Sequence, residues 1–505
     1  MRNITRREML RLLGLGAMGF AIAACAPKAA PEPTAEPTEA PAATAEATQA
    51  APSATDTALP TTAPLPTGTA GIPDIQVPTG STLEGFTPKL SNPSEKIELI
   101  YWWGNNYEPA LDFTNKIIAR FSLAYPNVTI KPVSGQNCDA FVTAAAAGTP
   151  PDFFHTWDCV ERMGNWAARD MIIPIDEYVS KDNFPLDDYF PGILDTCKMN
   201  GKLWGLVDSA GVFLLWTRPQ QFKDIGQDPS SSPKDTDELW DWARKLTTKD
   251  SSGNIQRLGM LMPNWAWTRF AWIVNFGGVL WDTTSNEPTP DHPGSLAALN
   301  DFVEQVKYYT PDALDRWSTS IGSQGGEQQP FLAGTCTMQE DADYSGQTIF
   351  DFHPEWKAGT DYDVLMVPPP PSDKLQGDSM VAWWSWPFVI PAGTKHPDWS
   401  WEVMRFFTSR EYQLNVHSKF KEMVVRKSMI DDARLWWPAV KLASQIVKGA
   451  RKLTTVIPMN PVAGDYINLL GEAYDNIMHL KATPESEMAR VKQETLDKLK
   501  AATES

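Results

Sequence analysis

The sequence predicts an α/β fold in which the folded part of the chain divides into two lobes. Strand-like and helix-like segments alternate between residues 97 and 155, and this order is typical of a parallel sheet. About 410 residues follow a low-complexity N-terminal region, which is more than one compact core usually holds. Apolar residues and turn formers are spread through those residues as in globular domains.

The first region, residues 1–25, has the pattern of a lipoprotein signal peptide. Four arginines within the first eleven residues precede an uncharged run from Leu12 to Ala24, which is too short to span a bilayer as a helix. Residues 5–10 resemble a twin-arginine export signal, and residues 22–25 resemble a lipobox. Cys25 would then carry the lipid that anchors the exported chain at the outer face of the cytoplasmic membrane. A plain secreted protein is the alternative.

Residues 26–94 are predicted to form a disordered linker. Residues 26–70 consist mainly of Ala, Pro and Thr, with no Val, Ile, Phe, Tyr or Trp. Such a composition cannot bury enough apolar surface to offset the entropy lost on ordering. At up to about 3.1 Å per residue, the linker would reach roughly 200 Å from the lipid. The folded part is therefore expected to lie near a membrane without touching it.

Charge and cysteine content exclude several classes of partner. The formal net charge of −18 argues against nucleic acid and against anionic lipid surfaces. No C-x-x-C pair or Cys/His cluster is present, so neither a metal nor a cofactor is predicted. Besides Cys25, the chain has Cys138, Cys159, Cys197 and Cys336, and disulfides persist outside the cytoplasm. Cys138 and Cys159 are the pair to test first because they are closest in sequence; four free buried thiols are the alternative.

The first alternating region contains three strands and two helices. Apolar residues recur at helical spacing, and turn residues such as Gly148 end the periodic segments. The predicted elements are a strand at 97–102, a helix at 110–124, a strand at 128–133, a helix at 140–147 and a strand at 152–155. In parallel sheets, ligands gather at the carboxyl ends of strands. Trp103, Asn105 and Asn106 follow the first strand, and Trp157 and Asp158 follow the third.

The rest of the chain continues the mixture of strands and helices. The expected elements are extended runs at 203–207 and 212–217, a helix at 239–246, a strand at 258–262, a strand leading into Glu340, a strand at 380–390 and helices to Ser505. Several of these strands end in polar and aromatic side chains, as the first strand does. These side chains are Asn264, Trp265, Trp267, Asp341, Asp343, Tyr344 and Trp384.

This order of elements resembles the family 1 extracellular solute-binding proteins, the maltodextrin-binding-like receptors of ABC importers. The stretches that carry the resemblance are residues 97–107, 150–154, 200–206, 276–278, 331–338, 362–368 and 386–391. The resemblance implies a periplasmic-binding-protein-like fold, with two α/β lobes joined by three crossing hinge segments. Family members usually have Gly-Gly before the strand that starts here at Met380, whereas this chain has Gln376-Gly377-Asp378-Ser379.

Placed on this chain, the resemblance gives boundaries for the lobes and the hinges. The crossings are expected near 206–212, 334–340 and 387–392. The N-terminal lobe would then comprise residues 95–207 plus 340–387, and the C-terminal lobe residues 212–334 plus 392–500. Each lobe is therefore expected to consist of discontinuous stretches of sequence.

The resemblance also implies a ligand site in the cleft between the lobes. Aromatic rings would cover the apolar face of a sugar, while amide and carboxylate groups bond its hydroxyls. We therefore expect the lobes to close around an oligosaccharide and deliver it to an ABC permease. The ligand-binding residues carried over are Trp103, Asn105, Asn106, Trp157, Asp158, Asp208, Asn264, Trp265, Trp267, Asp341, Asp343, Tyr344, Trp384 and Tyr466. For any single one of them, a place in the core, a helix cap or a hinge hydrogen bond is the alternative.

Two other functions fit part of the sequence. An aromatic cage with Asp341 and Asp343 would also hold a cation such as a polyamine. A lipid-anchored glycoside hydrolase would use two carboxylates at a defined separation. The sequence has no G-x-S-x-G or H-E-x-x-H motif, and its six histidines are scattered. A monomeric binding protein without catalytic activity is therefore the prediction.

Overall fold

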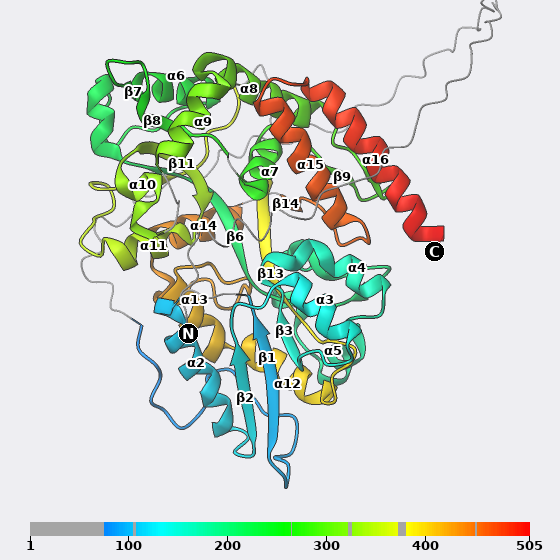
Figure 1. Cartoon of the computed structure of the whole chain (residues 1–505). Coiled ribbons are helices and arrows are strands. Elements are labelled where there is room, and N and C mark those ends of the chain that lie inside the picture. Colours follow the sequence, from blue (N-terminus) through cyan, green and yellow to red (C-terminus); the bar gives the residue numbers. More distant parts are fainter. Residues whose placement is uncertain are drawn as a thin grey trace, which may run out of the picture. The chain divides into compact units, whose positions relative to one another are not determined.

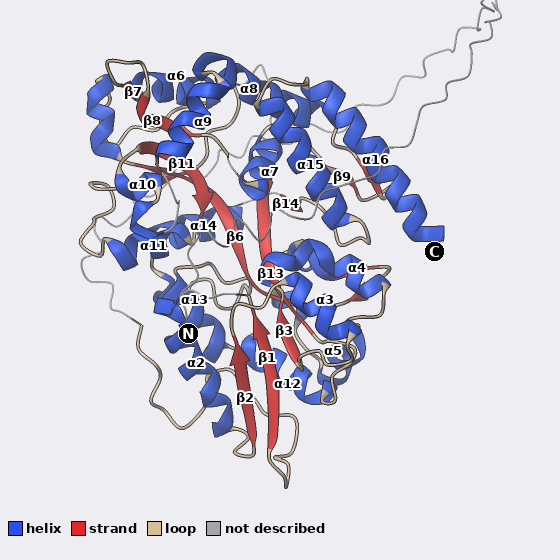
Figure 2. Cartoon of the chain, viewed as in Figure 1, coloured by secondary structure: helices blue, strands red, loops and turns tan. Residues whose placement is uncertain are grey.

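The computed structural model describes residues 75–104, 108–263, 265–321, 326–371, 380–449 and 452–504. Its main sheet has ten strands in the order β2-β1-β3-β13-β6-β11-β8-β7, with β12 paired to β6 and β14 to β13 (Figure 2). The strands of this sheet are β1 (Ile97–Trp103), β2 (Val128–Val133), β3 (Phe153–His155), β6 (Leu206–Thr217), β7 (Thr248–Lys249), β8 (Ile255–Leu261), β11 (Cys336–Ala342), β12 (Asp363–Leu365), β13 (Met380–Val389) and β14 (Lys452–Thr455). Two short hairpins pair β4 (Lys198–Met199) with β5 (Lys202–Leu203) and β9 (Trp281–Asp282) with β10 (Glu287–Pro288).

Helices account for most of the remaining described residues. The α-helices are α2 (Glu108–Ala119), α3 (Cys138–Ala146), α4 (Met163–Ala168), α5 (Asp176–Asp182), α6 (Thr236–Leu246), α7 (Ala266–Asn275), α8 (Pro293–Tyr309), α9 (Pro311–Ser320), α10 (Pro330–Ala333), α11 (Ser345–Phe352), α12 (Pro397–Phe407), α13 (Arg410–Phe420), α14 (Pro438–Gly449), α15 (Ala463–Met478) and α16 (Pro484–Glu504). The 3₁₀ helices are η1 (Arg120–Leu123), η2 (Trp157–Arg162), η3 (Leu186–Asp188), η4 (Ile193–Cys197), η5 (Pro219–Ile225), η6 (Gly326–Gln328) and η7 (Ala433–Leu435). In the part of the chain that the structure describes, no helix is long and apolar enough to cross a membrane.

Two groups of strands are joined by two long strands. In the first group, β1 pairs in parallel with both β2 and β3, as the alternating sequence pattern predicted. In the second group, β11 and β8 are parallel, and β7 is antiparallel to β8. β6 and β13 pair with each other in antiparallel fashion and run between the groups (Figure 1). Every residue of β6 is buried, so this strand forms the centre of the sheet.

A third segment, residues 421–437, also connects the two groups. Its first half runs beside β6, where Ser209 and Val424 form an antiparallel bridge. The helix before it, α13, packs on α2, and the helix after it, α14, packs on β12 and β6. One crossing was predicted at 334–340, and this position is wrong because β11 pairs with β8 from Cys336 to Gln339.

The predicted division into lobes also differs from the observed contacts. β11 and β12 both pair with the end of β6 that lies in the second group, although residues 340–387 were expected in the N-terminal lobe. α12 packs on β3 and α13 packs on α2, although residues 392–500 were expected in the C-terminal lobe. The physical reason is the third connection, which returns the chain to the second group only after α13.

The disordered linker predicted for 26–94 is wrong for its last part, from residue 75 onward. Phe86 is 8% exposed, and its ring lies 5.5 Å from that of Phe406. Arg120 donates hydrogen bonds to the carbonyl oxygens of Pro78 at 2.6 Å and Gly80 at 3.0 Å. Residues 75–94 therefore pack on the folded part of the chain. The predicted signal peptide, Cys25 and residues 26–74 lie outside the described residues.

Candidate ligand site

A pocket lies where the first and second strand groups meet. Val160 and Glu161 of η2 and Thr196 of η4 line it from the first group. Trp267 of α7 and residues 456–459 line it from the second group. Ser385 of β13 lies between them, and the space enclosed in this structure is narrow, about 10 Å³, which is room for about one water molecule. We call this space the cleft pocket.

The cleft pocket combines one aromatic plate with several oxygen atoms. The half-buried indole of Trp267 meets the ring of Phe270 edge-on at 5.5 Å, and this contact holds its orientation. The Thr196 and Ser385 hydroxyls lie 2.9 Å apart. Glu161 adds a carboxylate on the same side as Thr196. Such a surface can cover an apolar face and accept hydrogen bonds from hydroxyl groups at the same time.

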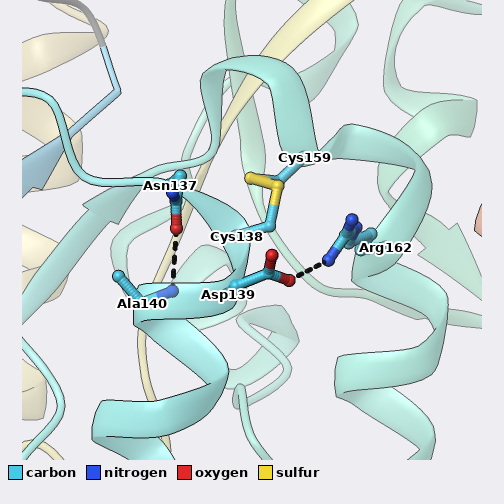
Figure 3. Close-up of a disulfide and its surroundings, with 6 residues drawn as sticks. All are labelled: Asn137, Cys138, Asp139, Ala140, Cys159 and Arg162. Carbon is cyan, nitrogen blue, oxygen red and sulfur yellow. Dashed lines mark hydrogen bonds and ion pairs between the residues drawn. A yellow bond between two sulfur atoms is a disulfide. The ribbon is translucent and has the colours of Figure 1, made fainter. Parts of the chain in front are cut away.

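The disulfide predicted between Cys138 and Cys159 is confirmed, and it fixes one wall of the cleft pocket. The Cys138 and Cys159 Cα atoms lie 5.7 Å apart (Figure 3). Asn137 caps α3 by accepting a hydrogen bond from the Ala140 amide at 2.8 Å. Next to the disulfide, Arg162 of η2 forms an ion pair with Asp139 of α3 at 2.6 Å. Because η2 is a short 3₁₀ helix, these links to α3 keep Val160 and Glu161 in place.

Removing the disulfide is expected to lower the free energy of unfolding by about 3 kcal/mol, since it closes a loop over a sequence separation of 21. The test compares urea unfolding of the oxidised protein with that of the Cys138→Ser/Cys159→Ser variant. Cys197→Ser is the matched control, because Cys197 is a buried thiol outside the disulfide. An equal loss in the control would show that any cysteine replacement in this core has the same effect.

Three aromatic residues that were predicted to bind ligand, Trp265, Trp267 and Tyr344, lie beyond the ends of strands in the second group. Trp265 precedes α7, is half-buried, and packs against Phe213 of β6 at 6.0 Å. Tyr344 follows β11 and contacts the ring of Trp386 on β13 at 5.8 Å. Trp265, Trp267 and Tyr344 are thus half-buried at the ends of second-group elements, and their expected ligand contacts stay predictions.

Asp208 instead belongs to a buried network at the crossings, which we call the hinge network: His155, Asp208, His417 and Glu422. Trp103 packs against this network. Asp208 lies 3.4 Å from His155 Nε2 and 3.6 Å from His417 Nε2. His417 Nδ1 lies 2.9 Å from Glu422. Trp103 is 2% exposed and stacks on His155 with the ring centroids 6.4 Å apart. In this structure these side chains line a small space of their own, and none of them lines the cleft pocket.

The hinge network shifts the protonation of its members. Burial alone would raise the pKa of Asp208, but His155 and His417 outweigh burial and hold that pKa below its usual value. Burial would lower the pKa of His417, but Glu422 and Asp208 raise it overall. Burial raises the pKa of Glu422, and His417 only partly opposes this effect. The network therefore favours a charged Asp208 beside a protonated His417.

Asp343 and Asp341 also accept hydrogen bonds within the fold. The two Asp343 carboxylate oxygens accept from the amides of Val212, at 2.9 Å, and Met423, at 2.8 Å. Asp343 thereby ties β11 to two of the three connecting segments. Asp341 accepts from the Ser345 hydroxyl at 2.7 Å. Burial raises the pKa of Asp343 to about 7 and that of Asp341 to about 6.

Tyr466 differs from its expected role as a stacking residue. Its side chain is fully buried, and its hydroxyl donates to the Leu280 carbonyl at 2.7 Å. Its ring packs against Trp281 at 5.7 Å. Tyr466 therefore joins α15 to the loop after α7 and presents no ring face to a ligand.

For the remaining predicted ligand-binding residues, the structure describes no side chain. Asn105, Asn106 and Asn264 lie outside the described residues. Trp157 and Asp158 are described through the backbone of η2, and Trp384 through the backbone of β13. Their expected ligand contacts stay predictions.

Sequence reasoning missed three polar residues of the cleft pocket: Glu161, Thr196 and Ser385. Glu161 lies two residues after the disulfide cysteine Cys159, and Ser385 lies between Trp384 and Trp386. Both residues are therefore close in sequence to positions that the sequence analysis singled out. Thr196 lies in η4, a short 3₁₀ helix that gives no periodic signal. The tertiary fold alone brings Thr196 to Ser385.

Comparison of the sequence with known proteins identifies relatives. A family model for bacterial extracellular solute-binding proteins matches residues 106–414. The maltotriose-binding protein of Pyrococcus abyssi is 25% identical over 319 residues, which cover 61% of this chain and 62% of that protein. The chain thus spans less than two thirds of that relative's length. The sn-glycerol-3-phosphate-binding periplasmic protein UgpB of Brucella abortus is 21% identical over 338 residues, covering 63% of this chain and 72% of the relative.

Solved structures confirm the predicted periplasmic-binding-protein-like fold. CpMnBP1 with mannotriose bound superimposes with a TM-score of 0.67 at 21% identity, covering 79% of this chain and all of that one. The maltose/maltodextrin-binding domain MalE of Bdellovibrio bacteriovorus bound to maltotriose gives 0.62 at 16% identity, covering 80% and 100%. Since the family model matches more than half of the sequence, this chain belongs to the bacterial extracellular solute-binding proteins.

Proposed function

We propose that this protein captures an oligosaccharide in the cleft pocket and delivers it to an ABC permease. The observation that carries the proposal is the pairing of the Trp267 indole with the oxygens of Glu161, Thr196 and Ser385 across both strand groups. An indole covers the C–H face of a sugar ring, and these oxygens suit its hydroxyls. Two similar proteins, the maltotriose-binding protein of Pyrococcus abyssi and CpMnBP1 with mannotriose bound, support this class of ligand.

The charge of the cleft pocket argues against an anionic ligand. Among the described residues that line it, Glu161 is the one charged side chain, and none is Lys or Arg. A phosphate group would therefore meet a carboxylate without a cation to balance it. This distinguishes the pocket from a site for glycerol phosphate, the ligand in the name of the UgpB relatives.

The carboxylates that a glycosidase would need are already engaged in structural contacts. Asp343 accepts two backbone amides, and Asp341 accepts the Ser345 hydroxyl. Neither arrangement leaves a pair of acids flanking a bound sugar. We therefore propose binding without turnover.

The proposed lobe boundaries follow the observed contacts. The first lobe comprises the strand group β2-β1-β3 with the helices up to η4, together with α12 and α13. The second comprises the residues after β6 through β12, together with α14 to α16. β6, β13 and residues 421–437 serve as the hinges. Lipid on Cys25, after export by the twin-arginine signal, would hold both lobes near the permease.

Calorimetric titration of the purified protein against a panel of gluco- and manno-oligosaccharides tests the proposal. A trisaccharide is expected to bind, because the cleft pocket presents contacts on both lobes. A polyamine panel and glycerol phosphate serve as the comparison. Binding of a polyamine with no heat from any sugar would replace the proposal with a receptor for a cationic solute.

Trp267→Ala is expected to weaken sugar binding about tenfold to a hundredfold, since a buried aromatic contact contributes roughly 1–3 kcal/mol. The measurement is the dissociation constant of the trisaccharide that the unmodified protein binds. Trp436→Ala is the matched control, because this tryptophan is 62% exposed and lies away from the cleft pocket. Equal affinities for Trp267→Ala and the unmodified protein would remove Trp267 from the site.

A further inference from the structure

A glycine at the edge of the cleft pocket lies in unusually close contact with the opposite lobe. Gly164 is the second residue of α4, which directly follows η2. A methyl group built on Gly164 would lie 1.9 Å from the carbonyl oxygen of Asn460 and 2.3 Å from its carbonyl carbon. Both distances are far below van der Waals contact. The backbone of Gly164 is α-helical, so glycine is needed here for space and not for its conformational freedom.

The Asn460 backbone cannot move aside without disturbing its own loop. Asn460 is 3% exposed, and its side chain bonds the Pro458 carbonyl at 2.9 Å and the Val462 amide at 3.0 Å. Its carbonyl oxygen accepts from the Ala463 amide at the start of α15. This loop directly follows residues 456–459, which line the cleft pocket. Movement of Asn460 would therefore disturb both the first turn of α15 and one wall of the pocket.

The Gly164 side of the contact is equally well fixed. The Cys138–Cys159 disulfide and the Arg162–Asp139 ion pair hold the preceding helix η2 against α3 (Figure 3). Within α4, Trp166 is buried and packs against Phe141 at 4.6 Å. A side chain at position 164 could therefore be accommodated only if the two lobes moved apart.

We propose that Gly164 is a positioning residue for ligand capture, because its lack of a side chain lets the Asn460 loop close onto η2 and α4. This inference rests on the proposed function, in which the ligand contacts both lobes when the cleft is shut. An alanine at this position would disfavour the closed state and leave the open state unchanged. Apparent affinity falls with the population of the binding-competent state, so a loss of at least about tenfold is expected.

The chain offers a matched control for this substitution in Gly464. Gly464 is the second residue of α15, and it faces η2 from the opposite lobe. A methyl group there would lie 3.6 Å from Arg162 Cγ and 3.9 Å from Glu161 Cγ, which are ordinary contact distances. Gly464→Ala thus places the same extra methyl group at the same interface without a clash.

The first test measures trisaccharide affinity by calorimetry and ligand-free thermal stability for both variants. Gly164→Ala is expected to bind at least about tenfold more weakly than the unmodified protein, with its ligand-free midpoint within about 2 °C. Gly464→Ala is expected to bind within about threefold of the unmodified protein. Unchanged affinity in Gly164→Ala, an equal loss in Gly464→Ala, or a midpoint that falls together with the affinity would each overturn the inference.

A second test does not depend on any sugar. Cysteines introduced as Glu161→Cys/Gly464→Cys would lie close enough to cross-link when the lobes are closed, and the free cysteines among the described residues, Cys197 and Cys336, are buried. The rate of cross-linking is expected to fall at least about tenfold when Gly164→Ala is added. Equal rates would overturn the inference. Failure of every sugar to bind, with a slowed cross-link, would instead reject the proposed ligand and retain the role of Gly164.

Discussion

Asp208→Ala is expected to lower the free energy of unfolding by about 3–5 kcal/mol, the usual cost of removing one partner from a buried charge network. Asp208 is 1% exposed and lies between His155 and His417, which come from β3 and α13. Without Asp208, these two imidazoles would share one buried space with no carboxylate between them. Urea unfolding near pH 6, where His417 is protonated, measures the effect.

Asp195→Ala is the matched control for this prediction. Asp195 pairs with Lys198 at 3.2 Å, but both side chains are about half exposed, and such surface pairs contribute little. We expect a change within about 0.5 kcal/mol. Measuring sugar affinity distinguishes a structural role of Asp208 from the ligand contact that was predicted for it. If Asp208→Asn kept the stability of the unmodified protein but lost affinity, Asp208 would be a ligand contact after all.

The arrangement of the first strand group could be predicted from the sequence because it depends on local patterns. The strands at 97–103, 128–133 and 153–155 alternate with helices whose apolar residues recur at helical spacing, and short connections leave few other topologies. The disulfide between Cys138 and Cys159 followed from proximity in sequence. These features involve residues that are near neighbours along the chain.

The third crossing could not be predicted in the same way. The crossing expected at 334–340 was carried over from the family resemblance. The strand there, β11, pairs with β8, which is more than 70 residues earlier in the sequence, and nothing local indicates that pairing. The segment that does cross, 421–437, has little regular secondary structure beyond η7 and so carries no periodic pattern.

Of the predicted site residues that the structure describes, Trp267 lines the cleft pocket, whereas the polar residues that line it were not predicted. A strand-end position places a side chain at the correct edge of the sheet without saying which face it occupies. Trp103 therefore lies among the buried hinge residues, whereas Trp267 lines the cleft pocket. Asp343 is a residue type that often binds sugar hydroxyls. Its carboxylate oxygens instead accept hydrogen bonds from the amides of Val212 and Met423, which are distant in sequence.

The buried Asp343 carboxylate makes the stability of the protein depend on pH. In the folded protein burial raises its pKa to about 7, compared with an ordinary value of 3.8. The folded state therefore keeps a proton that the unfolded chain releases between about pH 4 and 7, so stability falls as the pH rises through this window. His417 acts in the same direction, because its raised pKa gives stability below pH 6.5 that is lost as the pH rises further. Asp208 has a lowered pKa, and its contribution is constant above its ordinary value.

The protein is accordingly expected to be more stable at pH 5 than at pH 8, by about 3 kcal/mol from Asp343 alone. Urea unfolding at the two pH values measures the difference. Asp343→Asn cannot titrate, so this variant is expected to lose most of that difference, although its amide can accept only one of the two backbone hydrogen bonds. Asp195→Ala again serves as the exposed control and should keep the full pH dependence. If Asp343→Asn retained the same difference between pH 5 and pH 8, the titrating group would lie elsewhere, and the tie between β11 and the crossing segments would be insensitive to protonation.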